Sequence, residues 1–264
     1  MTVATAFSNY SYVLSGLFVG LLVGMTGVGG GSLMTPLLIL LFGVHPAAAV
    51  GTDLLFAAST KTVGTVVHGV AGTIDWRLVG LLALGSVPAA IGALFVLSML
   101  DLDGKAARQV ITFALSGVLF LTSVSLLCAN RVRHRFASPV SRLKPETGNL
   151  LTVLLGILMG LLVTSTSVGA GAIGVTALLL LHPTMPIARV VGSDIAHAVP
   201  LTLVAGLGHW LLGSVEWTLL ATLLIGSIPG IVVGSYLANR IPAGTVRVVL
   251  ALVLIVVSAK LLLS

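Results

Sequence analysis

The stretch that determines the fold reads GMTGVGGGS, occupies residues 24–32 and lies inside a long apolar segment. A similar run of small residues, TSTSVGAGA, occupies residues 164–172, again between apolar segments. A single glycine run in a hydrophobic helix is uninformative. Two runs at matching places in two similar halves predict a backbone break that is present twice. In membrane transporters, paired interruptions of this kind indicate the substrate site.

Composition predicts a membrane protein. The chain is 57% hydrophobic and only 8% charged, whereas soluble domains carry about 25% charged residues. The basic residues collect at segment ends, as topology signals do, so a sequence pI of about 10.1 does not indicate a nucleic-acid partner. We expect an all-α polytopic protein in a lipid bilayer. Its apolar segments span residues 12–27, 32–44, 46–72, 76–100 and 106–129, then 150–168, 172–181, 186–213, 217–238 and 245–263.

The two halves of the chain repeat each other. GTD at 51–53 matches GSD at 192–194, and GTIDW at 72–76 matches GSVEW at 213–217. In the same way GSVP at 85–88 matches GSIP at 226–229, and His68 matches His209. All of these pairs share one offset of 141 residues, and a constant offset indicates duplication. We expect a first transmembrane repeat at 1–129, a basic joint at 130–149 and a second repeat at 150–264.

The distribution of basic residues predicts that the repeats are inverted. If each glycine-interrupted helix pair is re-entrant or crosses twice, each half crosses the membrane an odd number of times. Nine Lys and Arg residues then fall on one side and three on the other, with Lys61 inside the membrane. Cytoplasmic loops carry the Lys/Arg excess. We therefore expect a multi-pass protein of the cell membrane with residues 130–149 in the cytoplasm and both termini outside.

This ordered set of motifs resembles the sulfite exporter TauE/SafE family of integral membrane permeases. The likeness rests on the glycine run, the PLL at 36–38, the AVGT at 49–52 and the duplicated motifs above, and it covers nearly the whole chain. The resemblance implies transport of a small sulfur-containing anion, such as sulfite or a sulfonate, outward and coupled to the proton gradient. The chain departs from the family pattern at Asp53 and Asp194, and in its diluted second glycine run.

The two breaks predict an anion site. Helices that start at a break present unpaired N–H groups and a positive dipole end, glycine lets an anion approach the backbone, and hydroxyl groups add donors. The alternative is that the glycines only let helices pack closely. The expected substrate-binding residues are Thr26, Gly27, Gly29, Gly30, Gly31, Ser32, Thr52, Lys61, Ser165, Thr166, Ser167, Gly169, Gly171 and Ser193.

Asp53 and Asp194 are expected to couple transport to protons. Each lies seven or eight residues after a proline that starts a helix, about 10–12 Å into that helix at about 1.5 Å per residue. A carboxylate inside a membrane is a functional candidate by default, and its protonation would remove a like charge and admit an anion. His197, one turn after Asp194, is a candidate relay partner. The alternative is that the aspartates only accept hydrogen bonds from the broken backbone.

Lys61 lies eight residues after Asp53, on roughly the same helix face, and Thr202 occupies the matching position in the second half. A lone ammonium inside a membrane needs a partner, either an aspartate or the substrate itself. A packing ion pair is the alternative. His68 and His209 are expected to make interface hydrogen bonds rather than bind ligands.

Other classes of function fit this sequence less well. It has no zinc-hydrolase or nucleophile-elbow motif, so we expect neither an enzyme nor a cofactor. The second hypothesis is a transporter of a cation or divalent metal that uses Asp53, Asp194 and His197, although the chain has no His-rich or Cys-rich tract. For the anion transporter we expect no metal site. The sequence is compatible with a homodimer but does not require one.

Overall fold

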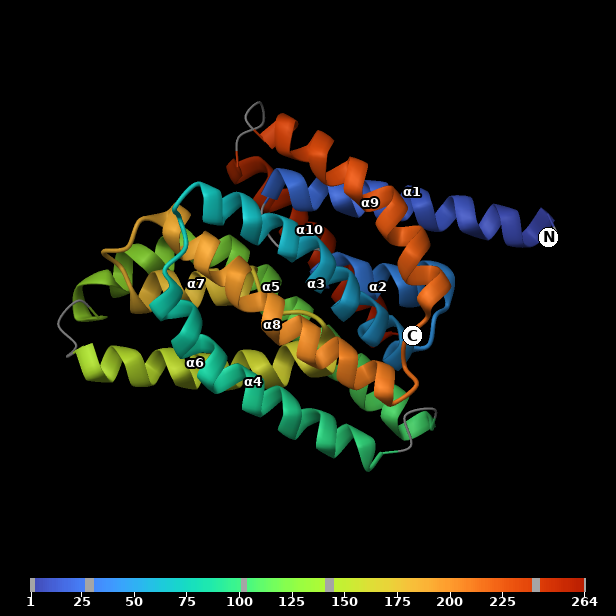
Figure 1. Ribbon diagram of the computed structural model, residues 1–264, viewed down its shortest axis with the longest axis horizontal. Coiled ribbons are helices and arrows are strands. Elements are labelled where there is room, and N and C mark those ends of the chain that lie inside the picture. Colours follow the sequence, from blue (N-terminus) through green and yellow to red (C-terminus); the bar gives the residue numbers. More distant parts are fainter. Residues whose placement is uncertain (1–2, 27–30, 101–103, 141–144, 239–242, 264) are drawn as a thin grey trace.

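The computed structural model describes residues 3–26, 31–100, 104–140, 145–238 and 243–263. Within these residues the chain forms ten α-helices and no strand, which confirms the predicted all-α architecture (Figure 1). The helices of the first half are α1 (Val3–Thr26), α2 (Gly31–Phe42), α3 (Pro46–Val70), α4 (Trp76–Ser98) and α5 (Lys105–Val140). Those of the second half are α6 (Pro145–Thr166), α7 (Ala172–Leu181), α8 (Ile187–Leu211), α9 (Trp217–Ala238) and α10 (Ala243–Leu262).

Five helical stretches of the described chain are long and apolar enough to cross a membrane. The helices α2 and α7, which begin at the end of each run of small residues, have only 12 and 10 residues. Because a crossing takes about 20 residues, neither of them can span a bilayer alone, as the sequence predicted. The inverted orientation of the repeats stays a prediction. The candidate spans are Trp76–Ser98, Arg108–Cys128, Glu146–Thr166, Ile187–Leu211 and Trp217–Gly234.

The polar joint is more helical than expected. α5 continues to Val140 and α6 begins at Pro145, so most of residues 130–149 is helix. Hydropathy marks where contact with lipid ends, but the hydrogen bonds of a helix can continue beyond that point. The arginines after Asn130 favour this continuation, because arginine is a good helix former.

The helices of the two halves pair with each other. α1 packs on α9, α4 packs on α6, α3 packs on α8 and α5 packs on α10. Figure 1 shows α3 and α8 in the middle of the molecule, with the α1–α9 pair on one flank and the α4–α6 pair on the other. Since α6 is the counterpart of α1 and α4 that of α9, the same contact is made twice with the halves exchanged. Each half is thus completed by helices of the other.

Glycines bring the two flanking pairs close together. A Cβ added to Gly226 of α9 would collide with the backbone oxygen of Val13 in α1. A Cβ added to Gly85 of α4 would collide with the backbone oxygen of Val153 in α6. These two glycines begin the duplicated GSIP and GSVP motifs, so these motifs serve helix packing, as small residues do between membrane helices.

We expect Gly85→Ala to destabilise the purified protein by about 1–3 kcal/mol, because the added methyl group would force α4 away from α6. The measurement is the melting temperature in detergent. The matched control is Gly92→Ala on the same helix, where an added Cβ meets no atom within 4 Å. Equal melting temperatures for the two variants would contradict the close packing.

Candidate functional site

The duplicated motifs meet across the two halves. The Glu216 backbone N–H donates to the Thr52 hydroxyl at 3.0 Å, and the Asp75 backbone N–H donates to the Ser193 hydroxyl at 2.8 Å. Glu216 and Asp75 directly precede α9 and α4. Each hydroxyl therefore holds the start of a helix that belongs to the other half.

The glycines before these hydroxyls make the contact possible. A Cβ added to Gly51 would collide with the carbonyl oxygen of Ser214, and one added to Gly192 would collide with that of Thr73. No larger residue fits at either position. Asp53 and Asp194 lie two residues after these glycines, and both are fully buried. The contact between the halves thus carries both carboxylates into the protein interior.

The backbone between α6 and α7 is broken at residues 167–171. Ser167, Gly169 and Gly171 have positive φ angles of 59°, 120° and 116°. Glycine adopts such angles without strain, whereas serine seldom does. The Val168 N–H turns back to the Thr166 hydroxyl at 3.2 Å. The predicted second break is therefore present.

Asp53 of α3 faces both this break and α2. The Thr35 hydroxyl donates to Asp53 Oδ2 at 2.5 Å. Ser167 lies close to the same carboxylate without hydrogen-bonding geometry. Within the described residues, Asp53 Oδ1 has no hydrogen-bond partner. One carboxylate oxygen is therefore anchored by α2, and the other lies on the side of the break.

Asp194 of α8 faces the start of α7. The Gly171 amide lies beside the Asp194 carboxylate, and a Cβ added to Gly174 would collide with Asp194 Oδ1. Neither carboxylate oxygen makes a hydrogen bond to any described residue. The positive end of the α7 dipole favours a negative group at this place.

Lys61 is the cation of this buried group. Its side chain is only 6% exposed, and it interacts electrostatically with both Asp53 and Asp194. His197 lies within electrostatic reach of Lys61. Its Nε2 lies 2.8 Å from the Ser86 hydroxyl, while its Nδ1 has no partner in the described part of the chain. We call Asp53, Lys61, Asp194 and His197 the buried charged group.

The structure brings only part of the predicted site together. Ser167 and Gly171 lie beside the buried charged group, and Gly169 lies between them in the break. The hydroxyls of Thr52 and Ser193 have backbone partners at the helix starts described above. Their role in substrate binding stays a prediction.

The other predicted residues either make no hydrogen bond to this group or lie outside the described residues. The Ser165 and Thr166 hydroxyls donate to carbonyl oxygens one turn earlier in α6. Ser32 is buried in α2. Of the first glycine run, Gly27, Gly29 and Gly30 lie outside the described residues, and only the helical backbone is described for Thr26 and Gly31.

Both histidines expected to make hydrogen bonds do so. His209 Nε2 donates to the Thr164 carbonyl oxygen at 2.9 Å. His68 Nδ1 lies 2.8 Å from the Thr73 hydroxyl. Thus His209 joins α8 to α6, whereas His68 joins the end of α3 to the loop that follows it.

Sequence reasoning missed Thr35 and Gly174. Thr35 is matched by Thr176 at the same offset of 141 residues, so the repeat alignment could have identified it. Gly174 is matched by Leu33, and no pattern in the sequence indicates that a glycine there leaves room for Asp194.

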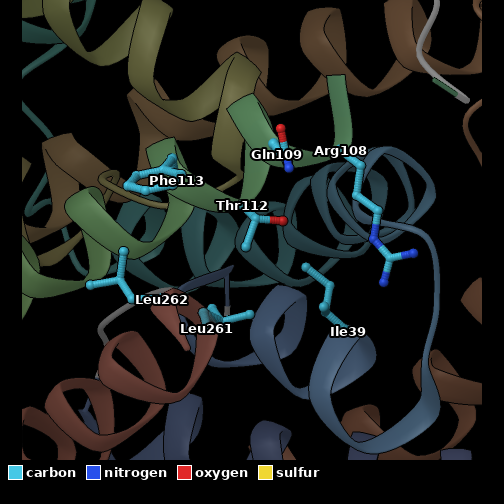
Figure 2. Close-up of a pocket in the computed structure, with 7 residues that line it drawn as sticks. All are labelled: Ile39, Arg108, Gln109, Thr112, Phe113, Leu261 and Leu262. Atoms are coloured by element: carbon cyan, nitrogen blue, oxygen red, sulfur yellow. The ribbon is translucent and has the colours of Figure 1, made fainter. Parts of the chain in front are cut away.

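A separate cleft of about 460 Å³ opens between α2, α5 and α10 (Figure 2). The polar residues of its lining come from α5, and the remaining lining residues are apolar. No member of the buried charged group lines it. The lining residues are Ile39, Arg108, Gln109, Thr112, Phe113, Leu261 and Leu262.

The described residues contain no group of three or more His, Cys, Asp or Glu side chains that could hold a metal ion. The buried charged group combines two carboxylates with an ammonium, and an ammonium repels cations. This donor set does not favour a divalent metal.

Comparison with known proteins identifies relatives over nearly the whole chain. The family model described as "Sulfite exporter TauE/SafE" matches residues 12–261. "Probable membrane transporter protein YjnA" of Bacillus subtilis is 39% identical over 255 residues, which cover 96% of this chain and 100% of the relative. "Probable membrane transporter protein YdhB" of the same organism is 28% identical over 233 residues, covering 87% of this chain and 90% of the relative. No solved structure matches the chain.

The apolar helices and these relatives define a multi-pass membrane transporter. The chain belongs to the sulfite exporter TauE/SafE family. The resemblance carried by its motifs is confirmed.

We expect Thr52→Val and Ser193→Ala each to destabilise the protein by about 1–3 kcal/mol, because each leaves a backbone N–H at the start of a helix without its partner. The measurement is the melting temperature in detergent. Thr222→Val is the control, since the Thr222 hydroxyl donates only to carbonyl oxygens of its own helix. Losses no larger than that of the control would show that these hydroxyls do not hold the halves together.

Proposed function

We propose that this transporter carries a small sulfur-containing anion, such as sulfite or a sulfonate, outward across the cell membrane and that this transport is coupled to protons. The observation that carries the proposal is the convergence of Lys61, Asp53 and Asp194, all buried, on the broken backbone between α6 and α7. A buried charge is expensive unless it is paired or bound to a ligand.

The charges of this group support binding that depends on protons. With all three side chains ionised, two carboxylates and one ammonium leave a formal charge of −1, which repels an anion. One proton brings the formal charge to zero and a second brings it to +1, which attracts an anion. Proton uptake would therefore load the site, and proton loss would expel the substrate.

Direct contacts with the substrate are assigned to Lys61, Ser167 and Gly171. Lys61 supplies the positive charge, Ser167 supplies a hydroxyl without a hydrogen-bond partner, and Gly171 lets the substrate approach the start of α7. The first break, from Thr26 to Ser32, would complete the site from the other half.

The exchanged helix pairs support transport between two inverted repeats. In transporters built in this way, the substrate site lies near the membrane midplane, and one repeat rocks against the other. The joint at 130–149 would then lie in the cytoplasm and both termini outside.

We expect Lys61→Met to reduce sulfite uptake into proteoliposomes about tenfold or more, since interactions with a charged group contribute about 1.5–3 kcal/mol. Lys61→Arg should retain part of the uptake. Lys260→Met, at the exposed end of α10, is the control. The assay compares sulfite, methanesulfonate, acetate and zinc. Uptake of zinc without uptake of any anion would contradict the proposal and favour a cation transporter.

We expect Asp53→Asn and Asp194→Asn each to weaken the coupling of transport to the pH gradient, because an amide stays neutral like the protonated acid and only one titrating carboxylate remains. In wild-type proteoliposomes, a lower pH on the loading side should raise anion uptake. In each variant uptake should respond less steeply to the gradient than in wild type, while exchange of anion for anion persists and shows that the protein is intact. Variants that respond to the gradient like wild type would rule out these carboxylates as coupling groups.

A further inference from the structure

The start of α7 has a protein carboxylate placed where an anion would bind. α7 has ten residues, so its N-terminus carries the partial positive charge of a helix dipole. Asp194 points at it from α8, with Oδ1 at the place that a Gly174 side chain would take. Asp194 is fully buried, and its two oxygens accept no hydrogen bond from any described residue. The carboxylate thus lies beside the Gly171 amide, at the place where an anion would meet the start of α7.

The matching aspartate of the first half is held differently. Asp53 accepts a hydrogen bond from the Thr35 hydroxyl. The residue that matches Gly174 there is Leu33. The first half therefore anchors its carboxylate by a hydroxyl, whereas in the second half the carboxylate of Asp194 lies against Gly174 without such an anchor.

Two further donors near the break have no partner in the described residues. The hydroxyls of Thr164 and Ser167 are buried and make no hydrogen bond of good geometry to a described residue, and that of Ser167 lies beside Asp53. Buried hydroxyls are almost always hydrogen-bonded, so both are candidate donors to a ligand that accepts hydrogen bonds. A small oxyanion is such a ligand.

We propose that the Asp194 carboxylate is an internal competitor that holds the place of the transported oxyanion at the start of α7, and that Gly174, by lacking a side chain, leaves this place to the carboxylate or the anion. This inference rests on the proposed function, because it assigns a place to the anion of that function. The substrate binds there only when Asp194 has moved away or lost its charge. Asp53, tied to Thr35, does not compete for this place.

The test measures anion affinity at one fixed pH by calorimetry on the full chain in detergent, with sulfite and methanesulfonate as probes. Asp194→Asn should bind them about tenfold more tightly than wild type, because two like charges a few ångströms apart repel by more than the about 1.4 kcal/mol that tenfold represents. Asp53→Asn, the matched change in the other half, should change the affinity less. Asp194→Ser is the second variant in case the amide disturbs folding, and it should also bind more tightly.

A second substitution tests whether the anion binds beside Gly174. In the Asp194→Asn background, Gly174→Ala should abolish the gain, because its methyl group would occupy the place beside the start of α7 from which the neutral amide can be displaced by the anion. Gly117→Ala, where an added Cβ meets no atom within 4 Å, should leave the gain intact.

The outcomes separate this inference from the function on which it rests. A wild-type protein and variants that bind no anion at all would overturn the proposed function. A wild type that binds anions as tightly as Asp194→Asn and Asp194→Ser, or a gain that survives Gly174→Ala, would overturn only the competitor role and leave the anion transporter standing.

Discussion

Two hydrogen bonds hold the halves of this transporter together at its centre. The Glu216 N–H donates to the Thr52 hydroxyl, and the Asp75 N–H donates to the Ser193 hydroxyl. Each joins the start of a helix in one half to a long helix of the other, beside a glycine that leaves no room for a side chain. Because the aspartates directly follow Thr52 and Ser193 in sequence, the same contacts bury both carboxylates. The site depends on this close approach.

The packing contacts are the same in both halves, but the charged groups are not. Lys61 has Thr202 as its match, and His197 has Phe56. Asp53 is anchored by Thr35 while Asp194 is unanchored. A duplicated helical framework thus surrounds an asymmetric group of charges.

Much of the fold could be predicted because local patterns encode it. The segments 172–181 and 217–238 agree with α7 and α9 at both ends, since apolar runs and the turns between them are local features. α5 was predicted too short, because hydropathy reports lipid contact and not the end of a helix. Thr52 and Ser193 were assigned to substrate binding, and their hydroxyls have backbone partners across the two halves. A hydroxyl that follows a glycine can bind a substrate or accept a hydrogen bond from a backbone N–H of the other half. The sequence does not show which backbone N–H group lies close to it in the folded protein.

The sequence by itself determined the membrane class, the repeated motifs, the break between α6 and α7 and the family, because composition, periodicity and spacing are properties of the chain alone. Only the tertiary structure decided that α1 pairs with α9 and α4 with α6, and that Asp194 lies against Gly174 at the start of α7. These contacts join residues far apart in the chain. In a membrane, the faces that meet lipid and those that meet other helices are equally apolar, so hydropathy cannot distinguish them and close packing of small residues selects the partner.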